Sequence, residues 1–144
     1  MNYVVKPFSE LSTKEFFEIV KLRIAVFVVE QNCPYQEVDE EDETAIHTWL
    51  EEDNDIVGYT RILDHGETVV MGRVIVNPAY RGKKLGKKLV DNTLNVIEET
   101  YPGKDIIIGA QAHLIDFYES AGFEVISDIY LEDDIPHIQM KRKN

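Results

Sequence analysis

The N-terminal part of the chain begins with a short apolar run and then changes to a helical repeat. Residues 3–7 predict a strand, and the S-x-x-E spacing of Ser12 and Glu15 is typical of a capping box at a helix N-terminus. Within that helix, apolar side chains recur at a spacing that predicts one buried face, formed by Phe17, Val20, Ile24 and Phe27. Residues 37–43 are nearly all acidic, so we expect them to form a solvated loop.

From residue 47 onward, the pattern favours strands. The β-rich runs 47–51, 56–63 and 68–76 are separated by turn-forming residues and predict an antiparallel meander. A helical repeat from Leu85 to Ile97 and a buried strand at 105–110 then predict a parallel crossover.

The C-terminal pattern predicts a short helix followed by two strands. The helix spans residues 114–121 and ends at Gly122, a residue suited to a left-handed cap. The strands cover residues 125–131 and 137–141, with an acidic turn between them. The order of elements indicates one mixed α/β domain over residues 1–144.

Composition narrows the classes of function. A chain of 144 residues that is 44% hydrophobic can bury one core. Its net charge of −12 opposes binding to nucleic acid or to an anionic membrane surface, because both depend on cationic side chains. The chain has one cysteine, Cys33, no signal-like start and no long apolar run, so we expect a cytoplasmic protein.

Positive charge gathers where the third meander strand passes into the following helix. No acidic residue occurs between Thr68 and Val90, whereas six Lys and Arg residues do: Arg73, Arg81, Lys83, Lys84, Lys87 and Lys88. These cations could form one solvated helix face. However, a helix N-terminus offers free backbone N–H groups, and Gly82 and Gly86 allow a phosphate to approach the main chain. We therefore predict a diphosphate site, although the P-loop and dinucleotide-binding spacings are both absent.

The same segment resembles the coenzyme A motif of the GNAT acetyltransferase superfamily. The stretch from Val74 to Gly86 follows the pattern [Q/R]-x-x-G-x-[G/A] after a strand, with Arg81 and Gly86 matching and Lys84 in the place of the middle glycine. Residues 111–123 (QAHLIDFYESAGF) resemble the family's N-x-x-A-x-x-F-Y-x-x-x-G-F segment. Further stretches are similar to the ElaA-like branch: 22–35, 72–76, 109–113 and 135–137.

The resemblance implies an acetyl-CoA-dependent N-acetyltransferase with the GNAT fold, a twisted mixed sheet of about six to seven strands flanked by about four helices. Such an enzyme moves an acetyl group to a primary amine of a small molecule or peptide by direct attack, through a tetrahedral intermediate. The resemblance also implies the residues that bind acetyl-CoA: Val74, Ile75, Val76, Arg81, Gly82, Lys83, Lys84, Leu85, Gly86, Lys87, Gln111, Phe117 and Tyr118. Backbone N–H groups of Val74–Val76 are the expected donors to the oxyanion.

The resemblance suggests the catalytic acid, but the base is open. Tyr118 matches the family's acid, which protonates the departing thiolate. Residues 69–76 contain no carboxylate to act as base, so Glu30, His47, His113, His137 and a water chain remain as candidates. We place His113 slightly ahead, because it lies between the Gln111 position and Tyr118.

The expected acceptor side comprises Arg23, Phe27, Glu30, His47, Arg73 and His137. Arg23 and Arg73 could bind a substrate carboxylate, or either could form a buried ion pair with an acid such as Glu30 or Asp39. We expect no metal ion, and the sequence leaves a homodimer open.

Two other functions stay open. Residues 23–27 resemble acyl-homoserine-lactone synthases, which favours a longer-chain acyl-CoA or acyl-carrier acyltransferase. The missing strand carboxylate favours a non-catalytic coenzyme A sensor.

Overall fold

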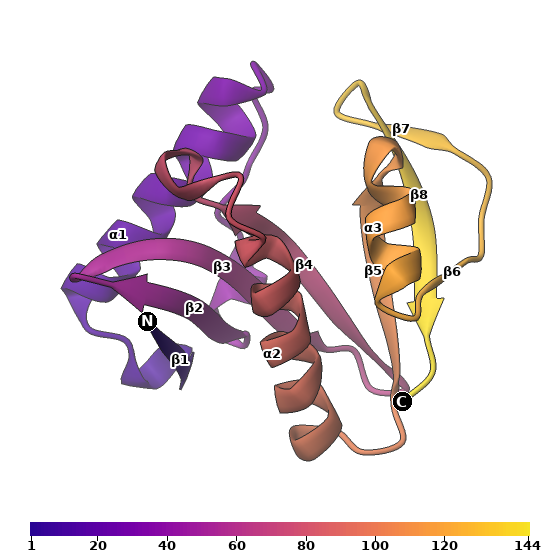
Figure 1. The fold of residues 1–144 in the computed structure, drawn as a ribbon, viewed down its shortest axis with the longest axis horizontal. Helices are drawn as coiled ribbons and strands as arrows, with labels where there is room; N and C mark the ends of the chain where they lie inside the picture. The colour runs from indigo at the N-terminus through magenta and orange to yellow at the C-terminus, as the bar shows by residue number, and fades with distance from the viewer.

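Eight strands form one mixed sheet in the computed structural model, which describes residues 1–144 (Figure 1). The strands are β1 (Asn2–Pro7), β2 (Ile46–Glu52), β3 (Asp55–Asp64), β4 (Thr68–Val76), β5 (Asp105–Gln111), β6 (Glu124–Val125), β7 (Tyr130–Glu132) and β8 (Ile135–Arg142). Their order is β1-β2-β3-β4-β5-β8-β6, and β7 also pairs with β8. The predicted meander is confirmed as β2, β3 and β4. The predicted 125–131 strand is wrong in its extent, because β6 and β7 replace it with two short pieces.

Three α-helices accompany the sheet: α1 (Thr13–Arg23), α2 (Leu85–Thr100) and α3 (Ile115–Ser120). The capping box at the start of α1 is confirmed, since the Ser12 hydroxyl accepts from the Glu15 N–H and the Glu15 carboxylate accepts from the Ser12 N–H. A π-helical segment (Ile24–Glu30) continues α1 without a break. Short 3₁₀ segments cover Phe8–Glu10, Glu40–Glu43, Pro78–Tyr80 and Ala112–Leu114.

The buried face of α1 differs from the prediction. Phe17 is 58% exposed, whereas Ile19, Arg23 and Val26 are buried. The apolar repeat missed this face because it treated Arg23 as a surface residue. Its buried acidic partners allow Arg23 to point inward, and the wider π-helical turn shifts the residues that follow it.

The acidic stretch 37–43 is also packed, contrary to the prediction of a solvated loop. Glu37 and Asp42 are each only 1% exposed. Both carboxylates pair with the Arg23 guanidinium at 2.7 Å, and Asp39 pairs with Arg61 at the same distance. Pairing of this kind allows charged side chains to be buried, and sequence charge alone does not reveal it.

Two helices cover opposite faces of the meander. Ile19 of α1 packs with Trp49 and Tyr59, whereas Leu89 of α2 packs with Leu50 and neighbouring Val57. Alternate strand residues point to opposite faces, so the adjacent Trp49 and Leu50 serve different helices. α3 joins the core on the α2 side.

Strands β4 and β5 start as a parallel pair and then separate, as the V-shaped gap between them in Figure 1 illustrates. Only Thr68–Val70 of β4 pair with residues 105–107 of β5, which confirms the predicted crossover. Beyond that point β4 carries a bulge opposite β3, where Arg73 takes a left-handed backbone conformation with φ of 50°. A bulge bends its strand, which explains why β4 turns away from β5.

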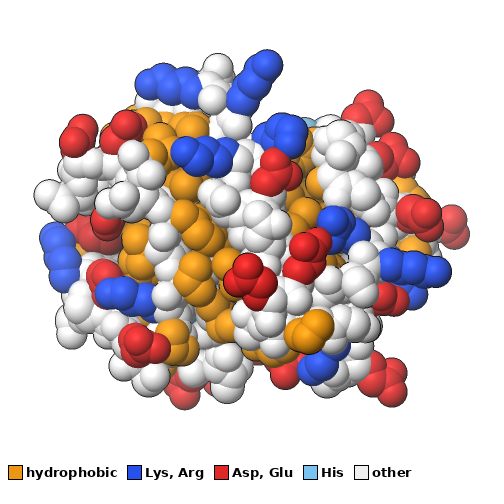
Figure 2. Space-filling view, turned by 60° about the horizontal axis from the view of Figure 1, so that its bottom comes forward, with side chains coloured by type: hydrophobic (Ala, Val, Ile, Leu, Met, Phe, Trp, Pro, Cys, Tyr) orange, Lys and Arg blue, Asp and Glu red, His pale blue; other side chains and the backbone are white.

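Charge is mixed over the face drawn in Figure 2, where a strip of hydrophobic side chains lies between interspersed acidic and basic ones. That face offers no continuous positive surface of the kind that nucleic acid requires. None of the helices combines the length and the apolar character needed to cross a membrane.

Candidate functional site

A cleft of about 830 Å³ occupies the space between the separating strands. Its walls come from the separated parts of β4 and β5, the π-helical segment, α3 and the β7–β8 turn. It brings together many of the predicted site residues: Phe27, Glu30, Arg73, Val74, Ile75, Val76, Arg81, Gly86, Gln111, His113, Phe117, Tyr118 and His137.

Both strand walls of the cleft offer unpaired backbone groups. Beyond Val70, the β4 edge that faces β5 has no strand partner. The β5 edge that faces β4 likewise has no strand partner beyond Ile107. These edges include Val74–Val76 and residues 108–111, which also line the cleft. A ligand with amide groups could hydrogen-bond to them in the manner of an inserted strand.

The predicted anion loop lies where one end of the cleft meets the N-terminus of α2. Gly82, with φ of 87°, and Lys84, with φ of 57°, both take left-handed backbone conformations. Lys84 therefore keeps the conformation for which glycine is favoured, at some cost in strain. No side chain caps the helix and no acid occurs in its first turn, so its N–H groups remain available to an anion.

Several predicted loop residues lie outside the cleft lining. Gly82, Lys83 and Lys84 are exposed beside its mouth, and the Lys87 ammonium pairs with Asp91 at 2.6 Å. Leu85 packs into the core, so it can contribute only backbone atoms to a ligand.

An ion pair links the anion loop to the π-helical segment. Both terminal nitrogens of Arg81 donate to the Glu30 carboxylate, at 2.8 and 2.7 Å. The guanidinium lowers the pKa of Glu30 by hydrogen bonding. Two residues predicted for different ligands, the cofactor and the acceptor, thus contact each other directly.

Tyr118 lies at the α3 wall of the cleft. Its side chain is 5% exposed and makes edge-to-face contacts with Phe117 and Phe123. Burial alone raises the pKa of Tyr118 to about 12, because no protein group hydrogen-bonds to its hydroxyl. The phenol is therefore a protonated group whose proton is free for a ligand.

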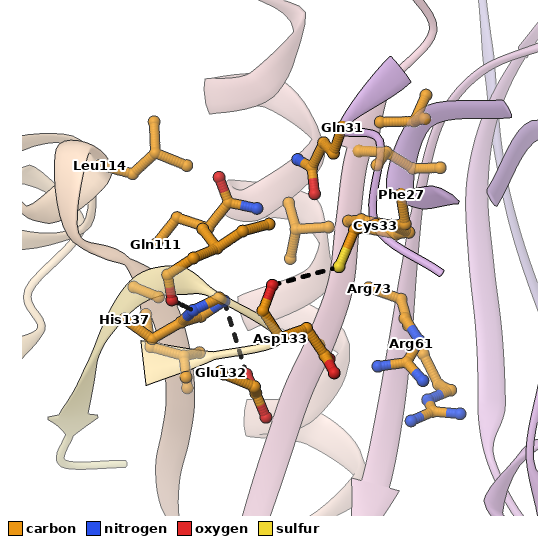
Figure 3. Close-up of a pocket in the computed structure, with 18 of the residues that line it drawn as sticks. Phe27, Gln31, Cys33, Arg61, Arg73, Gln111, Leu114, Glu132, Asp133 and His137 are labelled. Atoms are coloured by element: carbon orange, nitrogen blue, oxygen red, sulfur yellow. Dashed lines mark hydrogen bonds and ion pairs between the residues drawn. The ribbon is translucent and has the colours of Figure 1, made fainter. Parts of the chain in front are cut away.

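The three histidines predicted near the site have different surroundings. His137 lines the cleft, and its Nδ1 bonds to the Ile135 carbonyl oxygen at 2.7 Å (Figure 3). A carbonyl only accepts, so Nδ1 carries the proton and Nε2 of the neutral ring has a free lone pair. The Glu132 carboxylate lies 3.5 Å from Nε2. His113 is exposed at the cleft and has no hydrogen bond through its ring.

His47 does not reach the cleft, which corrects its prediction as a substrate residue. It is fully buried, with Nδ1 bonded to the Tyr59 hydroxyl at 2.6 Å and Nε2 to the Asp42 carbonyl at 2.9 Å. Burial lowers the pKa of His47. The residue is therefore structural.

Arg23 is structural for a similar reason, and its prediction as a substrate residue is also corrected. It has no exposed surface, and its nitrogens bond to Glu37 and Asp42. Burial opposes the charged form, but those bonds outweigh it and raise the pKa of Arg23. Arg73 does line the cleft, yet its Nε and Nη2 donate to Glu37, which leaves only Nη1 without a protein acceptor.

Sequence reasoning missed Arg61, which lines the cleft beside Arg73 (Figure 3). Only Nη1 of Arg61 bonds to protein, to Asp39 at 2.7 Å and to Asp42 at 3.1 Å. The sequence signal that could have pointed to Arg61 is its charge, because it lies within the otherwise β-rich run 56–63.

The comparisons with known proteins identify the family. The acetyltransferase (GNAT) domain matches residues 11–144, which is most of the chain. The chain belongs to the GNAT acetyltransferase family. Members of this family and fold are acyltransferases, and so is this protein.

Individual relatives agree with this assignment. Protein ElaA of Escherichia coli K12 is 47% identical, with 94% of this chain and 92% of ElaA covered. The crystal structure of Escherichia coli ElaA matches with a TM-score of 0.95 and 45% identity over 99% of both chains. An acyl-CoA N-acyltransferase from Pseudomonas aeruginosa gives a TM-score of 0.94 and 40% identity, again over 99% of both chains. An aminoglycoside 6′-N-acetyltransferase complexed with coenzyme A shares only the fold, with a TM-score of 0.71, 13% identity and coverage of 97% and 96%.

Proposed function

We propose that the chain transfers an acetyl group from acetyl-CoA to a primary amine. The observation that carries this proposal is the separation of β4 from β5, because it leaves two unpaired strand edges between an open helix N-terminus and the Tyr118 hydroxyl. The aminoglycoside 6′-N-acetyltransferase that shares the fold and is complexed with coenzyme A supports the choice of ligand.

The features of the cleft suit the diphosphate and the pantetheine arm of coenzyme A. The α2 N-terminus and the loop of Arg81 to Lys87 suit its diphosphate. Val74–Val76 and Gln111 lie along the unpaired edges, where the two amides of the pantetheine arm can find backbone partners. Bound acetyl-CoA would supply the acetyl group as an activated thioester.

We assign the base to His137 and not to His113. The Nδ1–H bond to Ile135 orients the His137 ring and leaves Nε2 free to accept a proton from an amine in the cleft. Glu132, 3.5 Å away, would stabilise the resulting imidazolium. His113 has no comparable partner to orient its ring.

The remaining roles follow from the positions of Tyr118 and of the β4 backbone. The ammonium form of the acceptor would give one proton to His137, and the neutral amine would then form the new C–N bond; the second proton would leave the nitrogen as the intermediate collapses and would restore the Tyr118 phenol. N–H groups of Val74–Val76 would stabilise the negative charge that develops on the carbonyl oxygen. The Tyr118 hydroxyl would protonate the sulfur as the C–S bond breaks.

The experiment measures release of free thiol from acetyl-CoA in the presence of a broad panel of amines. His137→Asn should lower kcat roughly 10²- to 10⁴-fold, the usual contribution of a positioned base. His113→Asn is the matched control and should leave kcat nearly unchanged.

Three results would contradict the proposal. Coenzyme A binding without amine-dependent release would favour a non-catalytic sensor. Release only from longer acyl donors would favour the longer-chain acyltransferase. Loss of activity in His113→Asn but not in His137→Asn would reverse the assignment of the base.

A further inference from the structure

One edge of the Arg61 guanidinium has no protein partner, and Arg61 lines the cleft. Nη1 makes both of its carboxylate contacts, which leaves Nε and Nη2 on the other edge. The Arg61 side chain is only 5% exposed, and its Nε is the one side-chain nitrogen or oxygen that is closed to solvent and also lacks a hydrogen bond. A buried donor without an acceptor is costly, so such a group points to a ligand that supplies one.

The space needed for that ligand is present beside Arg61. Gly72 lies opposite Arg61 in the β3–β4 register and lines the same cleft. A Cβ added at Gly72 would meet no atom within 4 Å. The missing side chain therefore leaves open volume on the face of the strand pair from which Arg61 projects.

A second donor lies close by. Arg73 directs Nε and Nη2 to Glu37, and its Nη1 has no protein acceptor. In Figure 3 the Arg61 and Arg73 side chains lie together on one side of the cleft, across from His137.

The charge balance disfavours a dianion. Three arginines (Arg23, Arg61 and Arg73) are paired with three carboxylates (Glu37, Asp39 and Asp42) in one connected network. The network is neutral, and Glu41, Glu132 and Asp133 add negative charge at the cleft. A dianionic phosphate would be repelled, whereas a planar carboxylate matches the two parallel N–H groups of a guanidinium edge.

We infer that Arg61, assisted by Arg73, binds the carboxylate of the acetyl acceptor, so that the acceptor is an amino acid or a similar amine that carries a carboxylate. This inference rests on the proposed acetyl transfer. The amino group of such an acceptor would extend toward His137 and the Glu132 and Asp133 carboxylates on the opposite wall.

The test compares matched acceptors in the acetyl-CoA thiol-release assay: amino acids, their carboxamides, and the corresponding amines without a carboxylate. The best amino acid should exceed its carboxamide in kcat/KM by roughly 10- to 150-fold, the effect of losing charged hydrogen bonds. Glycine against aminomethylphosphonate separates a carboxylate from a phosphonate, and preference for the phosphonate would overturn the assignment.

Arg61→Lys keeps the positive charge beside Asp39 and Asp42 but lacks the two-donor edge. In this variant, the preference for the carboxylate should fall to within about threefold, because one ammonium cannot make the bidentate contact. If Arg61→Lys does not fold, Gly72→Ala is the second variant, because the fold has room for the added methyl group. Gly72→Ala should lower kcat/KM only for acceptors that carry a carboxylate. An unchanged preference in the folded variant would overturn the inference.

A binding measurement separates this inference from the proposed function. Calorimetry with an N-acetyl amino acid and with its amide, both in the presence of coenzyme A, should show the same preference for the carboxylate. Selective binding without turnover of any amine would keep the carboxylate site and reject acetyl transfer. Equal turnover of amines that carry a carboxylate and of amines that lack one would keep acetyl transfer and reject the carboxylate site.

Discussion

Tyr118 places a protonated hydroxyl at the cleft without any protein partner, so Tyr118→Phe removes a proton donor and no structural hydrogen bond. We expect kcat to fall roughly 10²- to 10⁴-fold. Coenzyme A affinity and thermal stability should change little, because the aromatic contacts with Phe117 and Phe123 are retained. Unchanged thiol release by Tyr118→Phe would show that the phenol is not the acid.

The pH dependence of kcat tests the same residue in the unmodified protein. Burial raises the pKa of Tyr118 to about 12, so the phenol keeps its proton until the pH approaches that value. We therefore expect no loss of kcat from this group up to about pH 10, the ordinary pKa of tyrosine. A decline with a midpoint near 10 that disappears in Tyr118→Phe would contradict this expectation.

The Glu30 carboxylate accepts hydrogen bonds from the guanidinium of Arg81, which belongs to the loop that the proposed function assigns to the diphosphate of coenzyme A. In Glu30→Gln, Arg81 no longer has to leave a carboxylate, so coenzyme A should bind about two- to fivefold more tightly, as expected for an exposed pair. Calorimetric titration with coenzyme A at low and high salt measures this difference in affinity. Arg81→Gln is the counterpart and should weaken binding. Weaker binding by Glu30→Gln would mean that the pair organises the site.

At the scale of elements, α1 and the segment 37–43 are joined through buried charges. Arg23→Gln removes the shared partner of Glu37 and Asp42 and should lower the free energy of unfolding by about 3–5 kcal/mol. Urea denaturation measures this loss. Lys14→Gln, which disrupts an exposed pair with Glu18 on the same helix, is the control and should hardly move the midpoint. Equal effects of the two variants would contradict a buried network.

The same network predicts sensitivity to acid. Burial lowers the pKa of His47, so the unfolded chain takes up a proton there first as the pH falls through about 6.5. For Asp42, bonds to Arg23 outweigh the effect of burial and lower the pKa, which favours unfolding further below about pH 4. The Tm should therefore be highest above about pH 6.5 and decline on acidification. A Tm that stays constant down to pH 4 would contradict this.

Local sequence signals predicted most of the helices and strands, but they did not predict how the charged side chains pack. The capping box marked the start of α1 and the alternation of residues marked β2 to β4, because both depend on neighbours in sequence. The burial of Arg23 depends on carboxylates 14 and 19 residues further along, which no periodic pattern reports.

At the scale of the whole molecule, the cleft forms because a bulge at Arg73 turns β4 away from β5. Sequence motifs predicted the anion loop and Tyr118, since each lies within one contiguous stretch. The acceptor side brings distant loops together, as the 3.3 Å contact from the Cys33 Sγ to the Asp133 carbonyl oxygen illustrates. Arg61 was missed for this reason: its free edge is defined only once Asp39 and Asp42 have taken Nη1.

The central claim is that the separated strand edges hold the pantetheine arm of coenzyme A. Its most direct test is a calorimetric titration of the full chain with coenzyme A and with 3′-phosphoadenosine 5′-diphosphate, which keeps the diphosphate but lacks that arm. The account predicts one site for coenzyme A and at least about tenfold weaker binding of the truncated nucleotide, the equivalent of one to two amide hydrogen bonds. No heat with coenzyme A, or equal affinity for the two ligands, would contradict it.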